Sequence, residues 1–406
     1  MEVRNEILYM KLKSYLEGVC DNSLDWRRGS PQFENLLEFM DGQTCVAGTV
    51  RWWEPGMENK EEISKWMLGF SYLYQDMLGH LAWDERVFNE IYKRFENFLY
   101  DRDLIVTSIS PLYLFQCSLE EPVELDTDVG IMPREYDANM KRVLNRFETE
   151  GKHFSEDYNW FIYAHRKISK SQPRESSSDD STDTTKLEDI LMSLRLLHEG
   201  PVYAGPLHSD DGSPFAGIHG GHRLLTHSIL KRLPADYIVL ESYELKGEEI
   251  ESVQQIYKQL ASLNVRDRKF LDIPLGRFHD SYERRNERDK LIDLCIALES
   301  LYVREKDELA YRLALRCACF LERGKVELEN TFRRVKNIYD RRSGIVHGTA
   351  KALAEEQFSK LATEAEEYVR RSINKLLSDI RLVSRISKKP SKNELHFLDK
   401  AIFENT

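Results

Sequence analysis

The chain has 406 residues, 41% of them hydrophobic and 31% charged, with a formal net charge of -11. This length and composition are typical of an ordinary soluble protein with two or three compact cores. No run of about 18 apolar residues occurs, and charges interrupt the N-terminal segment where a signal peptide would be apolar. These features exclude a membrane-spanning chain and predict a cytoplasmic protein.

The six cysteines are scattered along the chain and form no CxxC pair. Their spacing predicts neither a zinc site nor a disulfide framework. Cys295, Cys317 and Cys319 fall within apolar helical patterns, so we interpret them as small core residues.

The first helical pattern covers residues 61–100. Apolar side chains recur there every three or four positions, which predicts one or two amphipathic helices. Trp52 and Trp53 stand just before this segment, and we interpret them as packing aromatics.

The next pattern is typical of strands. Residues 104–132 are rich in β-branched and aromatic side chains and are broken by Pro111 and Pro122, which predicts short strands. A second strand-like segment lies at 237–245. Because helices and strands are separated with no βαβ rhythm, residues 1–240 are predicted to form an α+β domain.

A polar segment, KSQPRESSSDDSTDTTK, occupies residues 170–186. Its Ser, Thr and Asp residues cannot bury enough apolar surface to offset the entropy of ordering, which predicts a mobile linker or loop.

A histidine-rich stretch follows, with carboxylates among the imidazoles. Its residues are His208, Asp210, Asp211, His219, His222 and His227. Imidazole and carboxylate are transition-metal ligands, but the spacing matches no metal-site pattern, and loops also collect such residues for turn geometry. We therefore predict no metal or cofactor and keep a metal-dependent enzyme as a minor alternative.

Residues 241–406 are helical almost throughout and are predicted to form an all-α bundle of about five helices. This part has 32 Lys and Arg against 29 Asp and Glu, whereas residues 1–240 have 26 against 40. The near-neutral balance is compatible both with RNA binding and with a solvated helical surface.

One motif in this part carries chemistry. Arg342 and His347 stand in an Arg-x4-His relation within YDRRSGIVHG, preceded by LGRFHDSYERRNERDKLIDLCIALESLY and ELAYRLALRCACFL. The order of these segments, over residues 248–385, resembles the Apea-like branch of the HEPN family. The resemblance implies a homodimer that joins two such motifs and, in active members, metal-independent RNA cleavage with Arg342 and His347 as catalytic residues.

The chemistry of RNA agrees with this implication, because the 2′-OH is a built-in nucleophile and the enzyme need only move protons and stabilise the phosphorus. His347 is assigned as general base or acid and Arg342 as stabiliser of the non-bridging oxygens. Ser343 shares a helical face with His347 and is expected to orient the imidazole or contact phosphate. Arg342 is offset by about 140°, so either a distortion at Gly344 or the dimer partner completes the site.

Further residues are expected to support the site. Glu299 interrupts an apolar helical stretch and is placed to hold Arg342 or a neighbouring arginine, or to form a purely structural ion pair. Arg312 and Arg316 are spaced i,i+4 and are candidate contacts to the RNA backbone, or ordinary solvated residues.

The prediction is thus an endoribonuclease whose relatives often serve as toxins or antiviral defence effectors, with an N-terminal region that regulates it or binds a regulatory partner. Two alternatives stay open. The pair Arg342 and His347 could simply cap and solvate the end of a helix before Gly348. The bundle could also be a non-catalytic scaffold that binds RNA, nucleotides or protein partners.

Overall fold

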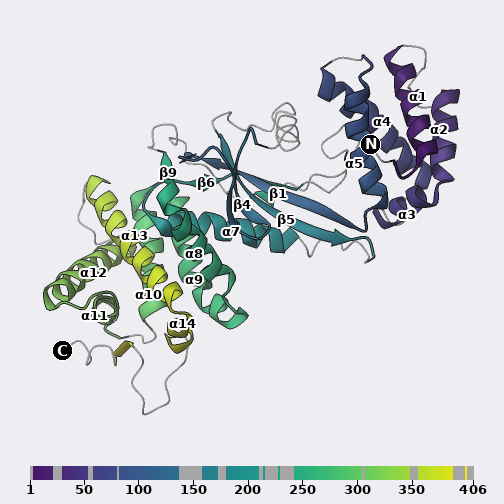
Figure 1. Ribbon diagram of the computed structural model, residues 1–406. Helices are drawn as coiled ribbons and strands as arrows, with labels where there is room; N and C mark the ends of the chain where they lie inside the picture. Colours follow the sequence, from purple (N-terminus) through teal and green to yellow (C-terminus); the bar gives the residue numbers. More distant parts are fainter. Residues whose placement is uncertain are drawn as a thin grey trace.

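The computed structural model describes residues 3–21, 30–53, 58–79, 82–136, 158–171, 180–209, 214, 227–228, 242–303, 307–347, 355–386 and 398–399. Every helix within these residues is too short or too polar to span a bilayer. The described chain combines an antiparallel sheet with two groups of helices (Figure 1).

The first group consists of α1 (Glu6–Cys20), α2 (Pro31–Asp41), α3 (Thr44–Trp53), α4 (Asn59–Leu78) and α5 (Glu85–Tyr100). Three of these helices begin at a side-chain cap, because Asn5, Ser30 and Asp84 each accept a backbone N–H of the first turn. The pattern predicted at 61–100 therefore forms two helices, and Gly79 ends the first of them with a φ of 74° that glycine adopts without strain.

These five helices have a core of their own. Its buried residues all lie between Leu8 and Leu104, and its centre is aromatic, with Trp66 and Phe70 packed edge-on against Phe95. Figure 1 shows the group at the far end of the long ribbon formed by two strands, away from the second group of helices. We call it the α1–α5 unit.

A fragment of residues 1–105 should fold by itself, because the core of the α1–α5 unit uses no described residue beyond Leu104. We expect a helical circular dichroism spectrum and a cooperative thermal transition. A fragment that is helical but melts without cooperativity would show that this core needs the rest of the chain.

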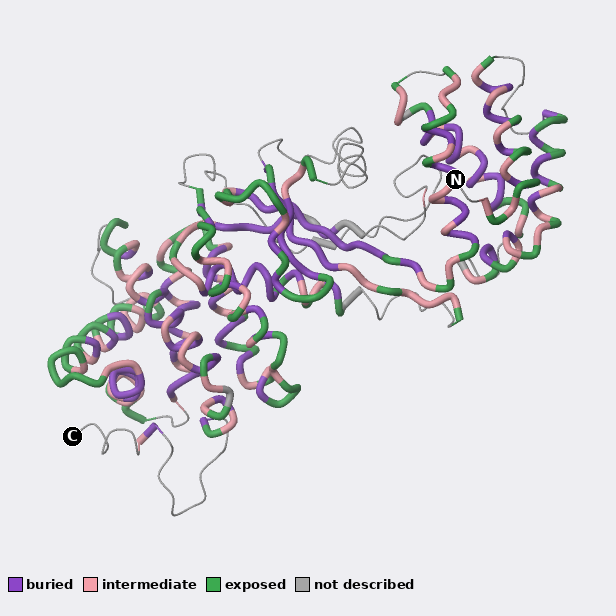
Figure 2. The backbone as a smooth tube through the Cα atoms, in the orientation of Figure 1, coloured by how far each residue is buried: buried purple, intermediate pink, exposed green. Residues whose placement is uncertain are grey.

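The sheet runs in the order β3 (Val123–Asp126), β4 (Val129–Pro133), β5 (Trp160–Ser169), β1 (Asp103–Tyr113), β7 (Pro206–Ser209) and β8 (His227–Ser228). The short strand β6 (Tyr203–Ala204) also pairs with β1, and β2 (Phe115–Cys117) pairs in parallel with β9 (Tyr243–Leu245). The strands predicted within 104–132 are thus present, and of the segment predicted at 237–245 the described part, 243–245, is the strand β9. Figure 2 shows β5 buried near the body of the molecule and less buried toward the α1–α5 unit.

Pro111 does not break the first strand as its sequence position suggested, since β1 runs through it as one strand of 11 residues. Its carbonyl accepts the N–H of Gly205, so its own nitrogen faces the junction of β6 and β7. A Cβ on Gly205 would lie 2.5 Å from the Pro111 ring. The N–H that Pro111 lacks would point at this junction, where the small Gly205 lets β6 and β7 approach β1, so its absence is tolerated.

Helix α7 (Asp180–Leu197) corrects the predicted linker, because residues 180–186 form its first two turns and residues 172–179 lie outside the described chain. Leu187, Ile190 and Leu194 face the sheet core, whereas Leu196 belongs to the core of the C-terminal helices. Apolar burial on two sides compensates for the polar start of this helix.

The second group consists of α8 (Ile250–Ala261), α9 (Val265–Tyr282), α10 (Glu287–Tyr302), α11 (Leu309–Leu321), α12 (Lys325–Val346), α13 (Glu355–Ser378) and α14 (Ile380–Ile386), after a 3-10 turn at Gly247–Glu249. The predicted helical character of this region is confirmed, with α9 as a helix that the sequence pattern did not reveal. Phe161 and Tyr163 of β5, which precede the predicted domain boundary at residue 240, share a core with α9 to α13.

A buried arginine joins α7 to the second group. Arg195 is 0% exposed, and its Nε and Nη2 donate to the carbonyl of Val202 at 3.2 and 2.9 Å. Its Nη1 lies 2.9 Å from Nδ1 of His279, and its guanidinium covers the ring of Tyr282 at 4.3 Å. Burial and this guanidinium lower the pKa of His279, so its Nδ1 serves as an acceptor.

A second buried arginine continues the contact on α13. Arg370 donates through Nε to the Arg195 carbonyl at 3.0 Å and pairs with Glu366, which is 3% exposed. Glu366 also accepts from the Tyr282 hydroxyl at 2.8 Å and pairs with Lys290 of α10 at 2.7 Å. The two arginines and this carboxylate thus connect four helices, α7, α9, α10 and α13, through polar groups that are largely buried.

Candidate active site

Arg342 lies on the inner face of α12. The buried residues Thr331, Val335 and Tyr339 are spaced four apart, with Ile338 beside them, and Arg342 follows Tyr339 by three positions on the same stripe. Its side chain is 19% exposed and turns toward α10, where its Nη2 lies 3.6 Å from Oε1 of the predicted partner Glu299. The carboxylate expected from the sequence therefore does stand beside this arginine.

Neighbouring residues hold the guanidinium of Arg342 in place, but its hydrogen-bond donors are not all used. The 3.6 Å separation from Glu299 is too long for a hydrogen bond, and the Nε of Arg342 is buried without a hydrogen-bond partner in the described chain. The ring of Tyr339 supports the guanidinium carbon at 5.6 Å. The Nε itself is buried, so an anionic ligand would meet the partly exposed remainder of this planar guanidinium.

His347 stands at the other end of the motif and is exposed. It is the C-cap of α12, with φ -91° and ψ 3°, and its backbone N–H donates to the Ser343 carbonyl at 3.0 Å. The helix continues through Gly344 to Val346, so the distortion considered at Gly344 is absent. Within one chain, Arg342 therefore turns inward while His347 lies at the surface.

Two residues beside Arg342 were not identified from the sequence. Cys295 and Tyr339 lie close enough to Arg342 and Glu299 to interact with them electrostatically. Their spacing was a signal in the sequence, because Cys295 precedes Glu299 by one helical turn and Tyr339 precedes Arg342 by another. Burial and the Glu299 carboxylate raise the pKa of Cys295 to about 12 despite Arg342. The thiol is therefore protonated near neutral pH and is no nucleophile.

The two predicted RNA-contacting arginines of α11 differ sharply. Arg312 is 38% exposed, pairs with Glu308 at 3.6 Å and has an Nε without a hydrogen-bond partner among the described residues. Arg316 is 2% exposed and donates to both carboxylate oxygens of Asp399 and to the Tyr302 carbonyl. The placement of Arg316 beside an RNA groove was therefore wrong, because its donors bind the protein interior.

Replacing Arg316 with methionine should lower the free energy of unfolding by about 2–4 kcal/mol, because a buried carbonyl and a carboxylate lose their donor. Arg312→Met should change it by less than about 1 kcal/mol, as expected for an exposed pair. Urea unfolding of both variants measures the difference. Equal effects would mean that Arg316 is solvated in solution.

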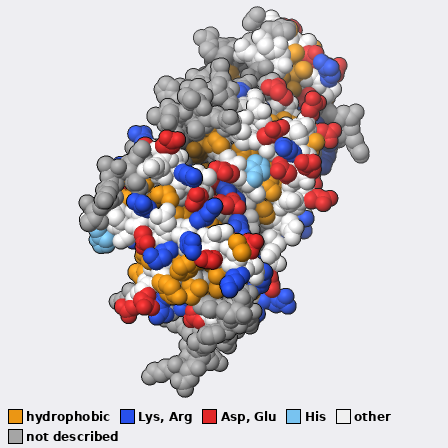
Figure 3. Space-filling model, turned by 90° about the vertical axis from the view of Figure 1, so that its left-hand side faces the viewer, with side chains coloured by type: hydrophobic (Ala, Val, Ile, Leu, Met, Phe, Trp, Pro, Cys, Tyr) orange, Lys and Arg blue, Asp and Glu red, His pale blue; other side chains and the backbone are white. Residues whose placement is uncertain are grey.

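The surface around α12 carries charges of both signs. On the side of the molecule that lies to the left in Figure 1, Lys and Arg side chains alternate with Asp and Glu around an apolar area (Figure 3). On α12 itself Arg333 pairs with Glu329 at 2.5 Å and Lys336 with Asp340 at 3.1 Å. This view thus shows no broad basic field, so a polyanion would depend on local cations such as Arg342.

The histidine-rich stretch gives no metal site among the described residues, where no group of three or more ligating side chains occurs. His208 lies on β7 and His227 on β8, while His219 and His222, with both aspartates, lie outside the described chain.

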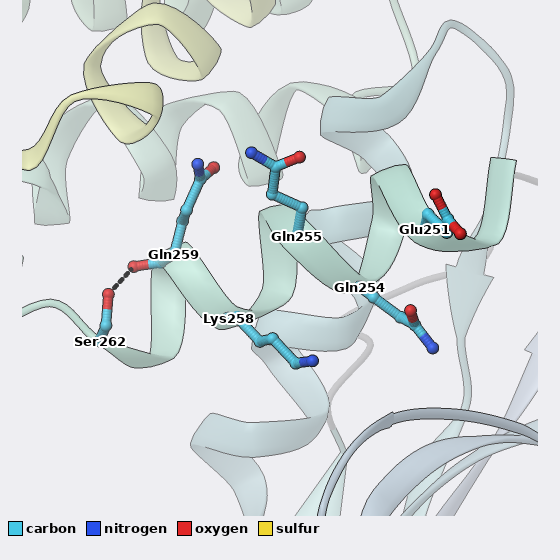
Figure 4. Close-up of a pocket in the computed structure, with 6 residues that line it drawn as sticks. All are labelled: Glu251, Gln254, Gln255, Lys258, Gln259 and Ser262. Carbon is cyan, nitrogen blue, oxygen red and sulfur yellow. Dashed lines mark hydrogen bonds between the residues drawn. The ribbon is translucent and has the colours of Figure 1, made fainter.

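Two hollows lie elsewhere. One, of about 410 Å³, follows the outer surface of α8 and is lined by Glu251, Gln254, Gln255, Lys258, Gln259 and Ser262 (Figure 4). The other, of about 460 Å³, lies among the β3–β4 turn, α7 and α8, with Lys186, Asp189 and Tyr257 in its wall. Neither includes a predicted site residue.

Comparison with known proteins gives no relative, since no family model, curated protein or solved structure matches this chain. The resemblance to HEPN domains accordingly rests on the order of motifs in residues 248–385.

Proposed function

We propose that this protein is a metal-independent endoribonuclease of the HEPN type. The observation that carries the proposal is the state of Arg342, a half-buried guanidinium held by Glu299 and Tyr339 whose Nε has no protein partner among the described residues. Five residues later the motif offers an exposed imidazole, His347. A fixed cation near an accessible acid–base group suits phosphoryl transfer within RNA.

The reaction needs no added nucleophile. The RNA 2′-oxygen forms a bond to phosphorus and gives its proton to one imidazole, while the bond to the 5′-oxygen breaks and that oxygen takes a proton from a second acid. The products are a 2′,3′-cyclic phosphate and a 5′-hydroxyl. Arg342 stabilises the charge on the non-bridging oxygens, and Ser343 orients His347 or contacts phosphate.

A homodimer explains how the two proton transfers are divided. Because His347 faces outward while Arg342 turns inward within one chain, a second copy of the helical region would supply the second imidazole. The α1–α5 unit and the sheet would then recruit or restrain the enzyme in the cytoplasm, as in toxin or antiviral defence proteins of this family.

The test is cleavage of end-labelled single-stranded RNA, in EDTA, by the wild-type protein and by His347→Ala. We expect cyclic-phosphate ends, no cutting of DNA with the same sequence, and a rate about 10²–10⁴-fold lower in the variant. Asn337→Ala, an exposed change on the same helix, is the control. A folded protein that binds RNA or a partner without cutting would favour the scaffold alternative, and activity only with added metal would refute the mechanism.

A further inference from the structure

Tyr339 links the two residues that define the Arg342 site. Its side chain is 7% exposed and lies one turn before Arg342 on α12, with the guanidinium carbon 5.6 Å from the ring centre. Its hydroxyl interacts with Glu299, the residue that pairs with Arg342 at 3.6 Å. Arg342 thus lies beside both the Tyr339 ring and the Glu299 carboxylate.

The Tyr339 hydroxyl can serve only as a donor toward Glu299. Burial and the hydrogen bond to Glu299 raise the pKa of Tyr339, so the phenol keeps its proton near neutral pH. The ring of Tyr339 lies beside the guanidinium of Arg342, with 5.6 Å between the guanidinium carbon and the ring centre.

We propose that Tyr339 is the positioning residue of this site, which fixes Arg342 through its ring and Glu299 through its hydroxyl. The inference rests on the proposed ribonuclease function for its effect on rate, but its structural part does not. A loose ion pair alone leaves a long side chain several rotamers, whereas an aromatic platform on the same rigid helix removes most of them.

The kinetic test compares Tyr339→Phe and Tyr339→Leu with wild type on a single-stranded RNA oligonucleotide. Loss of the ring should lower kcat about 10–100-fold with little change in KM, because misplacing a catalytic cation raises the barrier more than it weakens substrate binding. Loss of the hydroxyl alone should lower kcat about threefold. Tyr368→Leu is the matched control, since Tyr368 is also 7% exposed in the same core but contacts α12 near Thr331, about three turns from Arg342.

A second measurement does not depend on RNA. Urea unfolding is measured for Tyr339→Leu, Arg342→Met and the double variant. If the two side chains interact, the unfolding constant of the double variant should be at least about threefold smaller than the value obtained by multiplying the effects of the two single variants. If the protein cuts no RNA but the two variants are coupled, the proposed function is rejected and the contact between Tyr339 and Arg342 is supported. Absent coupling, or a folded Tyr339→Leu variant with wild-type kcat, would overturn the inference.

Discussion

Replacing Glu366 by glutamine should lower the free energy of unfolding by about 3–5 kcal/mol. Glu366 is 3% exposed and is the carboxylate that pairs with both Lys290 and Arg370. Glutamine keeps the shape and can still accept from Tyr282, but it removes the negative charge. Lys290 would then lose the carboxylate it pairs with, and the buried Arg370 would keep only the largely exposed Glu367 as a counter-ion. Removing one partner of a buried pair is the costly case.

The neighbouring Glu367 provides the control. It pairs with the same arginine at 2.8 Å but is 53% exposed, so Glu367→Gln should cost less than about 1 kcal/mol. Urea unfolding followed by circular dichroism measures both. If the two variants were equally stable, Arg370 would have to reach water in solution, and the buried contact between α7 and α13 would be incorrect.

Glu366 also gives stability a defined pH dependence. Burial by itself would raise the pKa of Glu366, but Lys290 and Arg370 outweigh it and hold that pKa below its ordinary value of 4.5. The unfolded chain therefore binds this proton first, so the stabilisation is present above about pH 4.5 and is lost as the pH falls through the folded-state pKa. The stability gap between wild type and Glu366→Gln should narrow as the pH falls below about 4.5. A constant gap would assign the loss to packing.

The second large effect is expected at Arg342. Arg342→Ala should lower the kcat for RNA cleavage about 10²–10³-fold, the size found when a donor to a developing oxyanion is removed. Stability should change by less than about 1 kcal/mol, because the arginine makes only a loose ion pair with Glu299. Activity and stability would thus separate at Arg342, whereas they fall together at Glu366.

Two further variants test the reason for this effect. Arg342→Lys keeps the charge but loses the planar donor fork, so we expect it to recover only part of the rate. Arg333→Ala removes a cation that is 73% exposed on the same helix and should leave kcat unchanged. Equal losses in Arg333→Ala and Arg342→Ala would mean that the general charge of α12, and not a positioned guanidinium, matters for RNA.

Local periodicity predicted part of the fold. The 61–100 pattern became α4 and α5, and the apolar runs after residue 248 became most of the C-terminal helices. Helices α1 to α3 and strand β5 were not predicted. The misses came from long-range packing that overrides local preference. Pro111 remains in β1 because Gly205 opposes it, and α9 accommodates Pro274 because Leu271, Leu275 and Phe278 are buried around it.

The sequence predicted which residue types form the site, but not which of their side chains are buried and which are exposed. Glu299 stood out as a charge within an apolar stretch, and it does pair with Arg342. Arg312 and Arg316 look alike in sequence, and only the position of Asp399, far along the chain, makes one of them a buried structural residue. The course of α12 through Gly344 to Val346 was likewise left open by the sequence.

The burial of Arg195 between α7 and α9 also limits where recombination can divide the gene. A gene segment that encodes only the C-terminal helices would lack Arg195, which contacts His279 and Tyr282. It would also expose to solvent the apolar residues that pack against β5 and α7. Recombination that separates α7 from α9 would therefore be selected against. The α1–α5 unit has a core of its own, so recombination could replace it with another domain. The sheet and the C-terminal helices would be inherited as one unit.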